Sequence, residues 1–117
     1  MSIQINGDTA ANYHWQIQTD GVFATGMNAT LMHVGGLNGA TATHWAGGVV
    51  DILNYQEAGL VKVITFTGTY VIAGDLVYRS GTGSWNTRTV AINRVTIFSD
   101  AATAQFSANS AAFLYGY

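Results

Sequence analysis

The side chains of this sequence that could do chemistry are few, and their spacing does not group them. Hydrolysis of a sugar needs two carboxylates that converge from separate segments, and no pattern in the sequence marks such a pair. Aspartates at positions 8, 20 and 75 adjoin a glycine, where aspartate commonly closes a turn through its own backbone. We therefore predict structural roles for the carboxylates, which are Asp8, Asp20, Asp51, Glu57, Asp75 and Asp100.

The histidines and the turn near the start of the chain are poorly suited to hold a metal ion. His14, His33 and His44 lack the short spacing of a zinc site, and the absence of cysteine removes any thiolate ligand. Calcium needs six or more oxygen ligands, and Asn6-Gly7-Asp8 lacks the spaced acidic residues that supply them. We predict no metal site, no cofactor and no catalytic residue.

The glycine-rich segment Ser80-Gly81-Thr82-Gly83-Ser84 has the small residues of a phosphate-binding loop but not its lysine or the helix that follows it. Ser84 also lacks the Gly-x-Ser-x-Gly setting of a hydrolase nucleophile. We expect this segment to be a connection between strands, and we expect the protein not to be an enzyme.

Aromatic residues beside loops are the remaining candidates for a binding surface. Trp45 and Trp85 flank expected loops, and Tyr117 belongs to a tyrosine-rich end. An exposed ring can stack on a sugar or anchor a protein partner, because it offers a large rigid apolar surface. We keep these three residues as possible interface or ligand contacts, against the alternative that the tryptophans are partly buried. Trp15 falls instead in a core pattern.

The composition excludes some partners and favours others. Charged residues make up 9% of the 117 residues, against about a quarter in ordinary soluble domains. Four scattered basic residues cannot neutralise many phosphates, so we expect no nucleic-acid binding. No apolar run approaches the roughly 18 residues of a membrane helix, and no signal peptide is visible. A net charge of −2 leaves little repulsion between copies, which favours assembly.

The apolar pattern indicates strands. In Tyr13-His14-Trp15-Gln16-Ile17-Gln18 apolar and polar residues alternate, as in a half-buried strand. Turn signals recur every eight to twelve residues or so, which is typical of a sandwich or barrel. We predict one all-β domain over residues 1–117, an antiparallel β-sandwich of jelly-roll type with about eight short strands. The other expected strands are Thr30–Val34, Gly48–Leu53, Val61–Thr67, Tyr70–Ile72, Asp75–Arg79, Thr89–Phe98 and Ala112–Tyr117.

Two segments depart from simple alternation. In Thr89–Phe98 the apolar residues change parity, which predicts a β-bulge near Asn93-Arg94 or a strand that crosses between sheets. The alanine-rich stretch Asp100–Ala112 has no apolar stripe, so we expect a loop with at most one helical turn. Thr41–Trp45 is also expected to be a loop.

Three motifs, in order, give the chain a resemblance to a group of bacteriophage virion proteins. Ile3–Tyr13 resembles an F-N-G-D-x-x-x-N-Y element, and Val49–Tyr55 resembles an I-x-I-x-[DN]-Y strand. Ala91–Phe98, Gln105–Ser110 and Phe113–Tyr117 together resemble a C-terminal I-x-x-I-x-F … F-x-x-G-S-x-F-x-L-Y-G signature. Asn109 stands where that signature usually has glycine. Longer proteins of the group have strands before the N-G-D element, whereas this chain begins almost at it. One sheet edge is therefore expected to be open.

The resemblance implies a jelly-roll sandwich displayed on a virion and made in the host bacterial cytoplasm. It implies no catalytic residues. The absence of a fibre shaft favours a capsid decoration protein, which would bind the major capsid protein and copies of itself as a dimer or trimer. The alternative is a tail-fibre tip that binds a receptor or a host-surface glycan.

Overall fold

The computed structural model describes residues 1–35, 46–72, 74–99, 106 and 110–116, and these residues form eight strands and no helix. The prediction of an all-β fold with about eight strands is confirmed. Across the described ranges, therefore, no helix has the length and apolar character to cross a membrane. The strands are β1 (Ser2–Ile5), β2 (Tyr13–Thr19), β3 (Val22–Ala29), β4 (Met32–His33), β5 (Ala46–Leu53), β6 (Lys62–Ile72), β7 (Asp75–Trp85) and β8 (Val95–Phe98).

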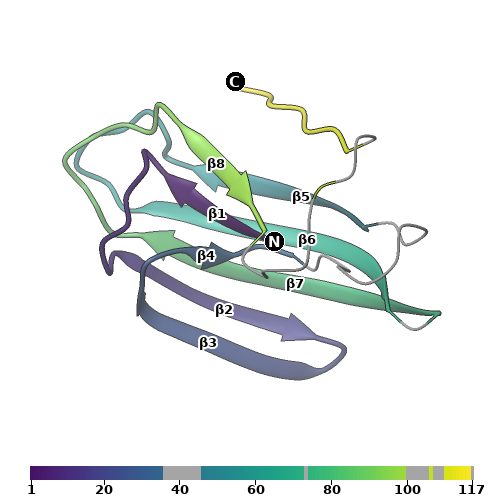
Figure 1. Ribbon diagram of the computed structural model, residues 1–117. Helices are drawn as coiled ribbons and strands as arrows, with labels where there is room; N and C mark the ends of the chain where they lie inside the picture. The colour runs from purple at the N-terminus through teal and green to yellow at the C-terminus, as the bar shows by residue number, and fades with distance from the viewer. Residues whose placement is uncertain (36–45, 73, 100–105, 107–109, 117) are drawn as a thin grey trace.

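The strands form two antiparallel sheets that pack as a sandwich. The small sheet has the order β4-β1-β8, and the large sheet has the order β3-β2-β7-β6-β5. Strand β1 pairs with β8 and β2 pairs with β7, whereas β2-β3, β5-β6 and β6-β7 are pairs of consecutive strands. Figure 1 shows the small sheet over one face of the large sheet, with β3 beyond its cover. In the described part of the chain, no strand covers the opposite face of the large sheet.

The core lies between the two sheets and follows from strand alternation. Residues of odd number in β2 face inward, and in β6 the even-numbered residues do so. Burial of each large side chain contributes about 1.5–3 kcal/mol to folding. The buried cluster consists of Ile3, Ile5, Tyr13, Ile17, Met32, Val34, Ile64, Phe66 and Trp85.

Strands β6 and β7 are longer than the sequence pattern indicated. Val61–Thr67 and Tyr70–Ile72 were expected as separate strands, but they belong to one. The connection expected at Ser80–Ser84 is wrong, because these residues continue β7. Large side chains occupy the space that a side chain at the glycines would need: a Cβ at Gly81 would lie 2.7 Å from the Phe66 ring.

The region before β8 also differs from expectation. Only Val95–Phe98 of the expected strand Thr89–Phe98 is a strand, and neither the bulge at Asn93-Arg94 nor a crossing between sheets is present in the described residues. Asn6 Oδ1 accepts hydrogen bonds from the backbone N–H groups of Asn93 at 2.9 Å and Arg94 at 3.0 Å. The side chain therefore replaces a strand partner at this point.

The remaining expectations had mixed outcomes. Gly48–Leu53 lies inside β5, which confirms that strand, whereas only two residues of Thr30–Val34 pair, as β4. The described residues 112–116 of the last expected strand are irregular. Strand β3 was not predicted, because its residues are exposed without alternation. Thr41–Trp45 and most of Asp100–Ala112 lie outside the described residues.

Candidate functional site

The Asn-Gly-Asp turn between β1 and β2 builds a network around Asp8. Oδ2 of Asp8 accepts hydrogen bonds from Trp85 Nε1 at 2.7 Å and from Asn12 Nδ2 at 2.8 Å. A third bond comes from Thr87 Oγ1 at 3.3 Å. Oδ1 of Asp8 accepts from the Ala10 N–H at 2.9 Å, which confirms the predicted turn closure. One carboxylate thus joins the first turn to the end of β7.

Tyr13 carries the same network into the core. Its hydroxyl accepts a hydrogen bond from the Ile5 N–H at 2.8 Å and donates toward the Asp8 carbonyl oxygen at 3.2 Å. The side chain is fully buried. The ring therefore ties β1 to β2 from inside, and the Asn-Gly-Asp…Asn-Tyr residues stabilise the fold.

The protonation states fit these bonds. Burial raises the pKa of the Asp8 carboxyl, but hydrogen bonds from Asn12, Trp85, Ala10 and Thr87 outweigh burial, and the pKa lies below its ordinary value. Burial also raises the pKa of the Tyr13 phenol, the backbone hydrogen bond to Ile5 opposes the rise, and the Asp8 charge adds to it. At neutral pH Asp8 is a charged acceptor and Tyr13 a neutral donor.

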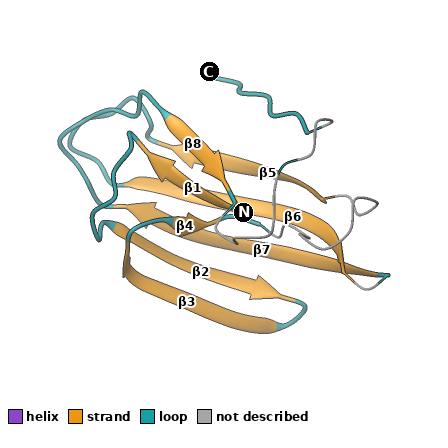
Figure 2. Cartoon of the chain, in the orientation of Figure 1, coloured by secondary structure: helices purple, strands orange, loops and turns teal. Residues whose placement is uncertain are grey.

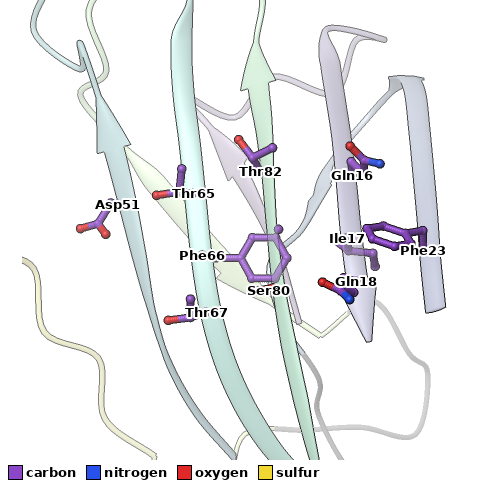
Figure 3. Close-up of a pocket in the computed structure, with 11 residues that line it drawn as sticks. Gln16, Ile17, Gln18, Phe23, Asp51, Thr65, Phe66, Thr67, Ser80 and Thr82 are labelled. Carbon is purple, nitrogen blue, oxygen red and sulfur yellow. The ribbon is translucent and has the colours of Figure 1, made fainter. Parts of the chain in front are cut away.

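A concavity with a volume of about 380 Å³ lies on the outer face of the large sheet. We call it the outer groove. Figure 3 shows β7 along its middle, with side chains of β2 on one side and of β6 on the other. Its outward-facing residues are Gln16, Gln18, Phe23, Asp51, Thr65, Thr67, Ser80 and Thr82.

The outer groove offers hydrogen-bonding groups with very little charge. Amides, hydroxyls and a single carboxylate, that of Asp51, line it beside the exposed ring of Phe23. Such groups bind hydroxyl-rich ligands, while an aromatic ring can cover an apolar sugar face. Acid–base hydrolysis of a glycosidic bond uses two carboxylates, and the lining supplies one.

Large apolar side chains are exposed on several elements, β5 with Val49 and Leu53 among them, and three further groups stand out. One is β3, with Val22, Phe23 and Met27; the second is the start of β7, with Leu76 and Tyr78. The third is the segment before the C-terminus, with exposed Phe113, Leu114 and Tyr115. Exposed apolar groups that gather on one element commonly mark an interaction surface.

Of the three candidate contact residues, the structure describes Trp85. Trp85 as an exposed contact is wrong: its side chain is 1% exposed, and its indole N–H is bound by Asp8. The reason is that β7 runs through the glycines and carries Trp85 into the core. Trp45 and Tyr117 lie outside the described residues. Trp15 is half-buried and packs edge-on against His33, with ring centroids 4.8 Å apart.

Sequence reasoning missed one buried cation and most of the outer groove. Lys62 is fully buried, and its Nζ donates to the carbonyl oxygens of Glu57 and, at 2.9 Å, of Leu60. Lys62 alternates in β6 with the same spacing as the buried Ile64 and Phe66, and this spacing is the sequence signal that could have predicted its burial. The same parity turns Thr65 and Thr67 outward, but the strands beside them could not be known from sequence.

Among the residues the structure describes, no group of three or more His, Cys, Asp or Glu side chains could hold a metal ion. We also compared the chain with protein-family models, with curated proteins and with solved structures, and none of them matches.

Proposed function

We propose that this protein is a structural, non-enzymatic component of a bacteriophage particle, and that it acts as a capsid decoration protein by binding adjacent capsid subunits. The observation that carries the proposal is the exposure of large apolar side chains on several elements of a chain with only 9% charged residues. Such surfaces are covered in a protein's working state. The resemblance of the motif residues to phage virion proteins is the reason for proposing a phage particle as the place where the protein acts.

The Asp8 network explains what the residues of the N-G-D motif do in this protein: they stabilise the fold. Asn6, Asp8 and Tyr13 hold the turn, the core and the approach to β8 in one arrangement. A motif that stabilises a sandwich fits a scaffold that works through its surface. The described residues of the motif contribute no open reactive group, which agrees with a passive role.

We propose that the hairpin between β6 and β7 carries the surface that binds the capsid. Leu76 and Tyr78 face outward there, and both are exposed. Apolar and aromatic anchors of this kind provide most of the energy of protein interfaces.

The test compares phage heads assembled without the protein and after addition of it. We expect the added protein to bind the heads and to raise the temperature at which they release DNA. Leu76→Asp and Tyr78→Asp should abolish both effects, whereas Thr89→Asp, which adds the same charge to an exposed loop residue, should not. Heads that bind no protein, or that are equally heat-resistant with it, would refute the role.

A second candidate function is binding of a host-surface glycan by the outer groove, as at the tip of a tail fibre. The observation that favours it is the lining of amides, hydroxyls, Asp51 and the Phe23 ring. Calorimetric titration with bacterial surface polysaccharides tests it. Gln18→Ala and Asp51→Ala should each weaken binding by at least about tenfold, while Thr89→Ala should not. Absence of binding to every polysaccharide of a susceptible host would exclude this function.

A further inference from the structure

Two rows of side chains cross the outer face of the large sheet, and both follow from the register of its strands. Figure 2 shows these five strands lying side by side. Neighbouring members of a row are roughly 5 Å apart, and the rows are roughly 7 Å apart. From β5 to β3, the first row consists of Asp51, Thr65, Thr82, Gln16 and Thr25. The second row consists of Val49, Thr67, Ser80, Gln18 and Phe23.

Most polar side chains of the two rows are not used by the fold. Thr82 Oγ1 donates to the Ile64 carbonyl oxygen at 3.2 Å and can still accept a hydrogen bond. Amides and hydroxyls both donate and accept, so a ligand rich in hydroxyl groups can pair with each of them. Within the described ranges, no side-chain hydrogen bond is made by Gln16, Gln18, Thr65, Thr67 or Ser80.

The charge of the outer face favours a neutral ligand. The strands of the large sheet, as the structure describes them, contain two cationic residues, Lys62 and Arg79. Lys62 is fully buried, and Arg79 donates from Nε to Thr19 Oγ1 at 2.9 Å on the inner face. The two rows contain one charged residue, Asp51. An acidic ligand would therefore meet a carboxylate and gain no cation in return for its lost hydration.

The order of polar and apolar groups fits a sugar chain better than a protein. Protein interfaces have an apolar centre and a polar rim. In the second row the apolar side chains, Val49 and Phe23, stand at the two ends and are 60% and 64% exposed, with polar groups between them. A sugar ring carries hydroxyls on its edge and C–H groups on its faces. It can thus pair with the middle of the row and stack on Phe23.

We propose that the outer groove binds an extended, uncharged polysaccharide whose chain crosses the strands from β3 to β5. Figure 3 shows Phe23 and Asp51 at the two sides of the groove. Four strand spacings, roughly 20 Å, separate their strands, which leaves room for several sugar units. Phe23 would cover a ring face at one end, and Asp51 would accept hydrogen bonds from hydroxyls at the other. This proposal rests on the second candidate function and adds the charge, shape and direction of the ligand.

Calorimetric titration of the full chain tests the charge of the ligand. The probes are a neutral glucan, mannan and galactan, and polygalacturonate before and after reduction of its carboxyl groups. We expect binding of a neutral chain that is at least about tenfold tighter than binding of polygalacturonate. Binding of polygalacturonate at least as tight as that of any neutral chain would overturn the proposal and leave glycan binding intact. Failure of every chain, the surface polysaccharides of a susceptible host included, would refute glycan binding itself.

A cation placed in the second row should change this preference. Thr67→Lys puts an ammonium group between two rows that lack one, and we expect binding of polygalacturonate to strengthen by at least about tenfold. Thr89→Lys adds the same charge to an exposed loop residue and should leave that binding unchanged. Circular dichroism checks that both variants keep the β fold. No gain in Thr67→Lys would show that the chain does not lie on the rows.

The length of the ligand tests the direction of the chain. A hexasaccharide of the neutral polysaccharide that binds should bind at least about tenfold more tightly than the disaccharide, because it reaches both ends of the groove. Phe23→Ala and Asp51→Asn, at opposite ends, should each weaken the hexasaccharide by at least about threefold. Thr89→Ala is the control. A disaccharide that binds as tightly as the hexasaccharide would overturn the extended chain.

Discussion

Asp8 shows how a single side chain combines a local and a distant role. Its bond to the Ala10 N–H is the turn closure that an aspartate beside a glycine predicts. Its bond to Trp85 spans 77 residues, and no local pattern could reveal it. The buried indole N–H requires an acceptor, and Asp8 is the acceptor that the first turn supplies.

Loss of this carboxylate should destabilise the fold. In Asp8→Ala the buried Trp85 N–H loses its acceptor, and we expect the free energy of unfolding to fall by about 2–3 kcal/mol. Urea denaturation followed by tryptophan fluorescence measures the change. Asp51→Ala removes an exposed carboxylate from the outer groove and should change stability by less than ~0.5 kcal/mol. Equal effects of the two variants would contradict the role of Asp8.

The same carboxylate should make stability depend on pH in the acid range. The pKa of Asp8 in the folded protein lies below its ordinary value of 3.8, so its contribution is complete above that value and is lost as pH falls through the folded pKa. The stability difference between the unmodified protein and Asp8→Asn should therefore be constant near neutral pH and shrink below about pH 4. Urea denaturation at several pH values measures it, and a difference that grows toward acid would show that the sign is wrong.

At the scale of elements, glycines decide where β7 can run. Gly81 lies opposite Phe66 on the neighbouring strand, and Gly83 opposite Ile64, so each glycine leaves room for large side chains above it. Glycine inside a strand often marks such a close approach. Read along the sequence alone, the same residues indicate a turn, and this ambiguity also explains why Trp85 was kept as a possible surface contact.

Substitution of Gly81 should distinguish a glycine that allows close packing inside a strand from a glycine that forms a turn. The methyl group in Gly81→Ala would meet the backbone carbonyl oxygen of Gln16 and, at 2.7 Å, the Phe66 ring, and we expect a loss of about 1–3 kcal/mol in the free energy of unfolding. Gly47→Ala is the matched control, because nothing lies within 4 Å of a Cβ there. It should be neutral or stabilise by up to about 1 kcal/mol.

A rescue variant completes this comparison. Phe66→Leu combined with Gly81→Ala should recover only the share of the loss that the Phe66 ring causes, because the Gln16 carbonyl oxygen still lies against the new methyl group. Additive losses in the double variant would mean that the Phe66 ring is not what Gly81 accommodates.

The fold class was predictable, and the exact strands were predictable only where one face is buried. Tyr13–Ile17 alternates because the small sheet covers its inner face, so β2 was recognised. Strand β3 lies beyond that cover and needs no apolar face, so its residues carry no alternation. The outer groove combines four neighbouring strands and β3, and its members become neighbours only through pairing that a single sequence does not reveal.

At the scale of the whole molecule, the small sheet covers one face of the large sheet. The small sheet covers the core, while no other strand of the described residues covers the outer face, and Val22, Phe23 and Met27 of the edge strand β3 are exposed. With 9% charged residues and a net charge of −2, electrostatic repulsion between copies is weak. Assembly of this molecule should thus follow from apolar contact and strand pairing.

This origin makes a prediction about solution conditions. Screening by salt weakens charged contacts but leaves apolar burial intact, so a rise from about 50 mM to about 500 mM sodium chloride should change the dissociation constant of the oligomer by less than about twofold. Apolar burial weakens on cooling, so the oligomer should dissociate more readily near ice temperature than at room temperature. Sedimentation equilibrium at both salt concentrations and both temperatures measures these effects. Dissociation by salt, or tighter association in the cold, would show that charge or hydrogen bonding, and not apolar burial, holds the copies together.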